Sequence, residues 1–137
     1  MPRPLRQFSP MNLFFGLLPQ PAPLRPESRV YDLKTRLDWG EPALTIIDVR
    51  NRARFNAQHI RGAISIPMAE LVTQARQSLE SDRDIYVYGE VDEEASHAAE
   101  QLRRAGFKQV SVLRGGAAAW KAAGFPLETL HQNPATL

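Results

Sequence analysis

The sequence predicts a single α/β domain in which helices cover both faces of a mostly parallel central sheet. Three short runs of apolar, often β-branched residues indicate buried strands, at residues 44–49, 84–88 and 109–113. Each run precedes a stretch with helical patterning, and strands that alternate with helices at this spacing form parallel sheets. With 137 residues, 43% of them hydrophobic and 23% charged, the chain is long enough to close one hydrophobic core.

The first elements of the domain follow a proline-rich start. A brief strand is expected at Arg29, and a short helix then places Leu33 and Leu37 on one face through their spacing of four. Gly40 and Pro42 stop this helix because proline cannot continue it.

The next elements continue the alternation. After the strand at residues 44–49, Asn51 is placed to cap a helix over residues 52–58. Residues 62–67 predict a second short strand that ends at its proline, and residues 68–79 have the pattern of an amphipathic helix.

The last third contains two helices. The first is expected over residues 92–104, with Gly106 near its C-terminal cap, and the second over residues 117–124. We expect both tryptophans, Trp39 and Trp120, to be packing residues.

The N-terminal segment differs in composition from the rest. Seven of the eleven prolines fall in the first 26 residues, together with three arginines and no acid. Proline removes backbone donors and prevents regular helix, so residues 1–27 are expected to form an extended, basic arm. The predicted domain then covers residues 28–128, and residues 129–137 form a tail.

The arm contains the cluster MNLFFGLL at residues 11–18, with Phe14 and Phe15 at its centre. It is shorter than the roughly 18 apolar residues that span a bilayer, and no signal-peptide cleavage site follows, so we expect a cytoplasmic protein. Phe14 and Phe15 could contact an anionic membrane surface or a partner protein. Two simpler readings, which we favour over membrane contact, are an arm packed on its own domain and a translation start at Met11.

One turn has an unusual charge. In the stretch DIYVYGEVDEEASHAAEQL, residues 84–102, a strand leads through a turn into a helix, an arrangement that ordinarily attracts anions. Here the turn contains Glu90, Asp92, Glu93 and Glu94, a formal charge of −4 with no base among them. We expect it to repel thiosulfate, sulfite and phosphate. The alternative, equally weighted, is that the acids stabilise the helix start by ~0.3–1 kcal/mol each, with Asp92 or Glu93 as a cap.

Two longer stretches resemble a known family. They are IIDVRNRARFNAQHIRGAISIP at residues 46–67 and the segment at residues 85–128 that includes VSVLRGGAAAWKAAG. In order and spacing these motifs are similar to those of rhodanese-like domains, which have the sulfurtransferase fold. The resemblance covers roughly residues 28–128, and Gln58 stands where the family usually has glycine.

The resemblance implies a cysteine at the end of the strand before the turn, where it would carry sulfur as a persulfide. In this chain that position is Gly89. The family's loop glycine, arginine and serine fall on Asp92, Glu94 and Ala95. The complete altered loop is Gly89, Glu90, Val91, Asp92, Glu93, Glu94 and Ala95. Since the whole chain lacks cysteine, a thiolate mechanism has no nucleophile.

Other chemistry has little support in the sequence. Ser96 and His97 are adjacent on a predicted helix and point about 100° apart, a poor nucleophile–base pair. Asp48 is expected to bond backbone at its strand end, and His59 to define the fold. Three scattered histidines lack the spacing of metal ligands. We expect no metal, no cofactor and no nucleic-acid partner.

The sequence therefore favours a catalytically inactive rhodanese-like domain that binds another protein or regulates it. The acidic residues Glu90, Asp92, Glu93 and Glu94 are the predicted binding residues of the loop, with Phe14 and Phe15 on the arm. The alternative function is sulfur transfer that depends on a partner protein supplying the thiol.

Overall fold

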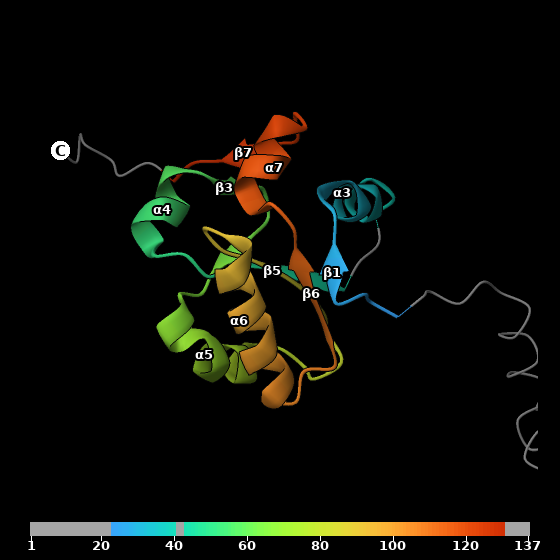
Figure 1. The fold of residues 1–137 in the computed structure, drawn as a ribbon, viewed down its shortest axis with the longest axis vertical. Coiled ribbons are helices and arrows are strands. Elements are labelled where there is room, and N and C mark those ends of the chain that lie inside the picture. Colours follow the sequence, from blue (N-terminus) through green and yellow to red (C-terminus); the bar gives the residue numbers. More distant parts are fainter. Residues whose placement is uncertain (1–22, 41–42, 131–137) are drawn as a thin grey trace, which may run out of the picture.

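The computed structural model describes residues 23–40 and 43–130 (Figure 1). The strands are β1 (Glu27–Ser28), β2 (Leu44–Asp48), β3 (His59–Ile60), β4 (Ile64–Ser65), β5 (Asp84–Tyr88), β6 (Gln109–Leu113) and β7 (Leu127–Glu128). The helices are α3 (Val30–Asp38), α4 (Arg52–Ala57), α5 (Leu71–Ser78), α6 (Asp92–Arg104) and α7 (Gly116–Ala122), with a short 3₁₀ helix η1 (Met68–Glu70) before α5.

The central sheet has five strands in the order β1-β6-β5-β2-β4, and every neighbouring pair in it is parallel. This confirms the predicted fold class. A second sheet was not predicted: β3 and β7 pair antiparallel, with His59 opposite Glu128. Strands of two residues have no alternation of their own, so only their tertiary contact reveals them.

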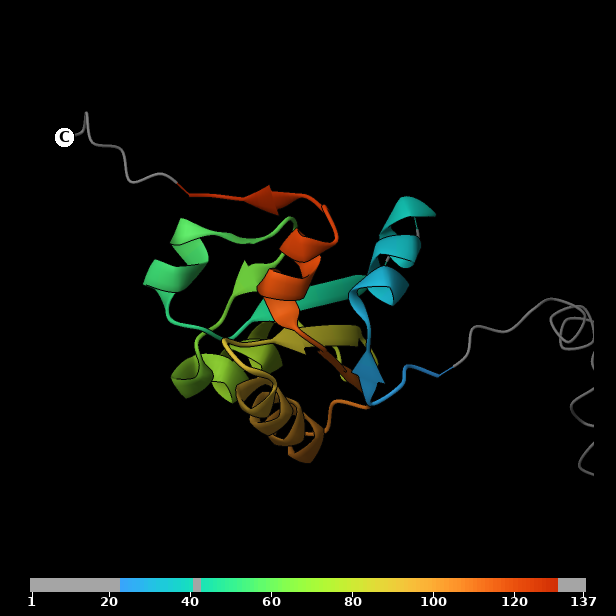
Figure 2. The same ribbon diagram turned by 45° about the horizontal axis from the view of Figure 1, so that its top comes forward.

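Helices cover both faces of the central sheet (Figures 1 and 2). Side chains alternate between the faces along β5: Ile85 and Val87 belong to one buried cluster, Tyr86 and Tyr88 to the other. The first cluster also contains buried residues of α5 and α6, and the second contains those of α3, α4 and α7. Strands covered on both sides explain the continuous apolar runs in the sequence.

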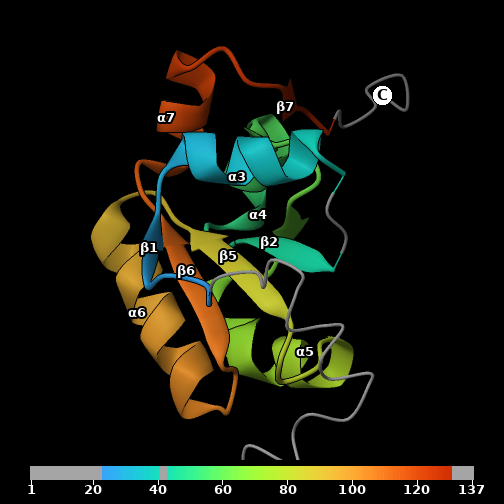
Figure 3. The same cartoon turned by 90° about the vertical axis from the view of Figure 1, so that its right-hand side faces the viewer.

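The parallel register brings several loops to one edge of the sheet (Figure 3). Asp48, at the end of β2, lies opposite Tyr88 at the end of β5, and Val87 lies opposite Val112 of β6. The segments that lead into α4, α6 and α7 therefore leave the sheet side by side. Ligand sites of open α/β sheets lie at this carboxyl edge.

Local predictions at the first helix needed correction. The strand expected at Arg29 lies one step earlier, at Glu27–Ser28, and α3 begins directly at Val30. Trp120 is buried, with 1% of its surface exposed, as expected of a packing residue, but the prediction for Trp39 was wrong: it is 80% exposed. Trp39 is the C-terminal cap of α3, beyond the buried positions Val30 and Leu33.

Other elements agree closely with the sequence. The Asn51 side chain accepts the N–H of Arg54 and so caps α4, as predicted. The helix expected over residues 68–79 is divided into η1 and α5. The predicted arm through residue 22, the stop at Pro42 and the tail beyond residue 130 lie outside the described residues. Within the described ranges, no helix combines the length and apolarity needed to cross a bilayer.

Candidate functional site

The altered loop connects β5 to α6 at the carboxyl edge of the sheet. Val91 is the N-terminal cap residue of α6, and no side chain caps the helix there. The alternative in which Asp92 or Glu93 caps the helix is therefore wrong: the Asp92 side chain bonds a different loop, and no described residue bonds the Glu93 side chain. The acids still lie in the first turn, where they interact favourably with the helix dipole.

Glu94 folds back over the start of the loop. Its Oε1 accepts the backbone N–H of Glu90 at an N···O distance of 2.7 Å. A Cβ built on Gly89 would lie 2.5 Å from the same oxygen and 3.0 Å from the Glu94 Cγ. The Glu94 carboxylate therefore occupies the space beside Gly89 that a side chain would need, and it takes a backbone donor that would otherwise face a bound anion.

Glu90 is paired with arginines from the neighbouring β2–α4 segment. Arg54 donates to Glu90 Oε1 through Nε at 3.0 Å and to Oε2 through a second, short hydrogen bond. Arg50 Nη1 lies 3.9 Å from Glu90 Oε1. The Arg54 and Glu90 side chains are each about half exposed, so this two-point contact contributes modestly to stability. It does fix the loop against α4.

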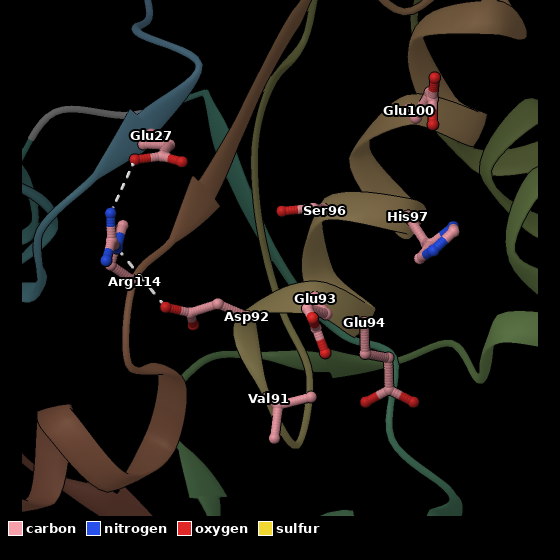
Figure 4. Close-up of a pocket in the computed structure, with 9 residues that line it drawn as sticks. All are labelled: Glu27, Val91, Asp92, Glu93, Glu94, Ser96, His97, Glu100 and Arg114. Atoms are coloured by element: carbon pink, nitrogen blue, oxygen red, sulfur yellow. Dashed lines mark hydrogen bonds and ion pairs between the residues drawn. The ribbon is translucent and has the colours of Figure 1, made fainter.

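Asp92 connects the loop to the start of α7. Its Oδ1 accepts the N–H of Gly115 at 2.9 Å, and its Oδ2 lies 3.4 Å from Arg114 Nε. Arg114 also donates to Glu27 at 3.0 Å, a contact that Figure 4 shows beside the loop. The hydrogen bond and charge of Glu27, with the charge of Asp92, raise the pKa of the Arg114 guanidinium, which therefore stays charged.

A buried ion pair between Asp48 and Arg50 lies next to the loop. Asp48 Oδ1 accepts the backbone N–H of Arg50 at 2.9 Å, as predicted for a strand end, and the Arg50 side chain bonds both Asp48 oxygens. Arg50 also donates to the Gln58 carbonyl at 2.7 Å. Burial opposes the charge of Arg50, but the hydrogen bond to Asp48 and its charge outweigh burial and raise the arginine pKa.

Tyr88 completes this support. Its hydroxyl accepts the N–H of Ile60 at 3.1 Å, and its ring lies under the Arg50 guanidinium, 5.5 Å from ring centroid to Cζ. Burial, followed by the neighbouring Asp48 carboxylate, raises the pKa of the Tyr88 phenol far above its usual range. The phenol is therefore a neutral structural group rather than a proton donor near neutral pH.

An open hollow of about 730 Å³ lies along the outer side of the loop and α6. Its lining residues are mostly acidic: Glu27, Val91, Asp92, Glu93, Glu94, Ser96, His97, Glu100 and Arg114 (Figure 4). Ser96 and His97 point to different sides of α6, so the structure does not bring them together as a catalytic pair. Val91 is 57% exposed at this surface.

The remaining candidates lie apart from the loop or have structural roles. His59 is buried, stacks on Phe55 with ring centroids 3.7 Å apart, and its Nδ1 lies 2.7 Å from the Phe55 carbonyl oxygen. Across residues 23–40 and 43–130, no three His, Asp or Glu side chains gather in a way that could hold a metal ion. Phe14, Phe15 and His131 lie outside the described residues.

Comparison with known proteins identifies the family. The sequence profile of the rhodanese-like domain matches residues 30–123. The chain belongs to the rhodanese-like domain family. The solution structure of a rhodanese-like domain from Anabaena is similar to this one, with a TM-score of 0.75 and 52% identity over 81% of this chain and 86% of that one.

Curated relatives of this rhodanese-like chain have varied descriptions. A sulfurtransferase from Allochromatium vinosum is 30% identical over 95 residues, which cover 69% of this chain and 87% of that protein. An HTH-type transcriptional regulator from Mycobacterium tuberculosis is 38% identical over 99 residues, covering 71% of this chain but 42% of the regulator. The chain spans about half the length of several curated relatives that it matches.

Taken alone, the loop has four acids and no base. The rhodanese-like fold places Arg54, Arg50 and Arg114 around it, so the four acids do not stand as an uncompensated −4. Sequence reasoning missed these arginines because they lie 22 to 40 positions along the chain from Glu90 and Asp92, in other connections of the sheet. The shared carboxyl edge of the parallel strands was the signal that could have found them.

Proposed function

We propose that this rhodanese-like domain performs no persulfide sulfur transfer and acts as a protein-binding or regulatory module. The observation that carries the proposal is the pair Gly89 and Glu94. Glycine stands where the family resemblance places the sulfur-carrying cysteine, and the Glu94 carboxylate fills the adjoining space and accepts the Glu90 N–H. The loop thus lacks the nucleophile and binds its own carboxylate where an anionic donor would approach.

The chemistry of sulfur transfer supports this reading. A persulfide forms only when a thiolate attacks the donor sulfur, and the chain has no cysteine at any position. Glu93 and Glu94, which form no ion pair with a described arginine, would in addition repel an anionic donor.

A sulfur-transfer assay with thiosulfate and cyanide tests the inactive state. We expect the purified full chain to form no thiocyanate above the rate of the reagents alone. Turnover that scales with protein concentration and is lost on heat denaturation would overturn the proposal, because it would require another nucleophile in the chain.

The binding role needs a variant that changes charge without dismantling the loop. Glu93 suits this purpose, because no described residue bonds its carboxylate, whereas Glu90 and Asp92 hold Arg54 and Arg114. Glu80→Gln is a matched control, since Glu80 is an exposed acid that precedes β5, whereas the altered loop follows β5. We expect proteins captured from native cell extract by the full chain to be weakened by Glu93→Gln and retained by Glu80→Gln.

A further bait with Glu90, Asp92, Glu93 and Glu94 all changed to amides measures the loop as a whole. If the four-amide variant captures the same proteins in the same amounts as the full chain, the loop is not the recognition surface. Circular dichroism of each bait shows whether a lost partner reflects lost charge or lost folding.

The second candidate function is sulfur transfer assisted by a partner that supplies the thiol. The sulfurtransferase relative from Allochromatium vinosum, of which the match covers 87%, is the observation that favours it. This candidate function requires that thiocyanate form only when the chain is mixed with a cell fraction that contains the partner. Alkylation of the thiols in that fraction should abolish the activity. Turnover by the partner fraction alone would remove this candidate.

A further inference from the structure

A second surface of the domain, on α3 and away from the altered loop, exposes large aromatic side chains. Tyr31, in the first turn of α3, is 62% exposed, and Trp39, the C-terminal cap of α3, is 80% exposed. Tyr31, Thr35 and Trp39 are spaced by four residues, so they lie along the same side of the helix. The opposite side, with Val30 and Leu33, is buried.

The aromatic face is held in a defined shape. The Tyr31 ring packs edge-on against Phe125, with centroids 5.2 Å apart and planes at 84°. The Thr35 hydroxyl, between the two exposed aromatics, already donates to the Tyr31 carbonyl at 2.9 Å. The face therefore presents two large aromatic side chains, Tyr31 and Trp39, with Thr35 between them.

The described chain begins beside this face. Pro23 and Leu24 line a hollow of about 440 Å³ together with Asp32, Thr35 and Arg36 of α3. The Leu24 N–H donates to the Gln109 side chain at 3.0 Å, which fixes the point where the preceding segment joins the domain. The described chain thus starts next to the helix that displays Tyr31 and Trp39.

The arm has one segment suited to such a face. Six of the eight residues 11–18 are apolar, including Phe14 and Phe15. Residues 19–23, three of them proline, separate this segment from Leu24. In an extended proline-rich conformation five residues span about 16 Å, and the nine residues of α3 extend about 13 Å. These lengths are compatible with contact between residues 11–18 and both exposed aromatics.

We propose that residues 11–18 dock on the outer face of α3, with Phe14 and Phe15 in contact with Trp39 and Tyr31. This interaction does not depend on the function of the altered loop. It would cover the exposed aromatic surface within one chain and would leave that surface free for another apolar partner only when the arm is released.

The test uses the two tryptophans of the full chain. Trp39 is exposed and Trp120 is 1% exposed, so collisional quenching by acrylamide reports chiefly on Trp39. The Trp39→Phe variant leaves only the Trp120 signal and allows it to be subtracted. The arm is altered by Phe14→Ser with Phe15→Ser, and Phe8→Ser is the matched control, because Phe8 lies in the arm but outside the docking segment.

We expect the Trp39 emission to shift to longer wavelength in the double serine variant but not in Phe8→Ser. An arm docked for more than half of the time makes the quenching constant of the double variant at least about twofold larger. Equal quenching in all three chains would overturn the proposal. Protection of Trp39 that depends on protein concentration, or that appears only with phosphatidylglycerol vesicles, would overturn it in favour of a second copy or a membrane surface.

Discussion

Gly89 and Glu94 share one small space at the start of α6. A Cβ on Gly89 would meet the Glu94 Oε1 at 2.5 Å and its Cγ at 3.0 Å, so the carboxylate can hold the Glu90 N–H only because position 89 lacks a side chain. A side chain at position 89 and the folded-back Glu94 carboxylate therefore exclude each other sterically.

The first prediction tests this coupling by stability. Gly89→Ala should destabilise the protein by about 1–2 kcal/mol, because the methyl group displaces the Glu94 side chain from its hydrogen bond. Glu94→Ala should cost less in the Gly89→Ala background than in the unaltered chain, since the bond is already lost there. Urea unfolding of the four proteins measures the coupling. Additive free-energy changes would show that the two residues do not share the space.

The second prediction concerns thiol chemistry. Gly89→Cys introduces the only thiol of the chain, next to a carboxylate that raises its pKa by repulsion and leaves it poor in sulfur transfer. Its reaction with a dipyridyl disulfide at neutral pH should be slow. Removing the acid with Glu94→Ala should accelerate the reaction about three- to fourfold for each unit by which the pKa falls, because the gain in thiolate is partly offset by its lower nucleophilicity. Glu100→Ala is the control. It removes an acid that lies about two turns beyond Glu94 on α6, so it should change the rate little.

At the scale of elements, the altered loop is held by both of its neighbours. Arg54 of α4 binds Glu90, and Arg114, just before α7, binds Asp92. The β2–α4, β5–α6 and β6–α7 connections thus form one linked edge. A partner that bound this edge would meet a loop fixed in place by arginines, with Val91 and Glu93 facing outward.

The third prediction separates the two tryptophans by their helices. Trp120 of α7 is buried, and its indole donates to the Pro126 carbonyl at 2.7 Å. Trp120→Ala should therefore lower the free energy of unfolding by about 3–5 kcal/mol. Trp39→Ala, at the exposed end of α3, should lower it by at most about 1 kcal/mol. Thermal and urea unfolding check both values, and comparable losses for the two variants would contradict the described packing of α3.

At the scale of the whole molecule, Tyr88 joins the sheet to the β3–β7 side of the domain. Its phenol accepts the Ile60 N–H within the core that α3, α4 and α7 cover. Because burial and Asp48 raise its pKa, the folded protein keeps Tyr88 neutral at pH values where the unfolded chain ionises it. The contribution of Tyr88 to the free energy of unfolding is therefore complete below the pKa that Tyr88 has in the unfolded chain. It falls as pH rises from that value toward the higher pKa of the folded protein.

The fourth prediction follows from this linkage. Above pH about 10, the usual tyrosine value, Tyr88 should contribute a fall in the free energy of unfolding of roughly 1.4 kcal/mol per pH unit. Tyr88→Phe should be less stable at pH 8, because it loses the hydroxyl contacts, but its stability should fall less steeply between pH 10 and 11. Tyr31→Phe, at an exposed position, is the control. Parallel profiles for Tyr88→Phe and the unaltered chain would contradict the assignment.

Local patterns were sufficient for most of the fold. The apolar runs at β2, β5 and β6, the Asn51 cap and the glycine after α6 each act within a few residues, so their effects are visible in order along the chain. The β3–β7 pair and the exposure of Trp39 were not visible in this way. Both depend on contacts, or on their absence, with residues far away in the chain. A short stretch of sequence carries no information about such contacts.

The sequence by itself determined the parallel α/β class and the absence of a sulfur-carrying thiol, because strand and helix periodicity and the chemistry of cysteine are local properties. Only the tertiary structure decided what the four acids of the altered loop do. Folding brings Arg54 and Arg114 to Glu90 and Asp92, and it turns Glu94 back onto the Glu90 N–H beside Gly89. Charges act through space, and these distances are fixed only when the strands align.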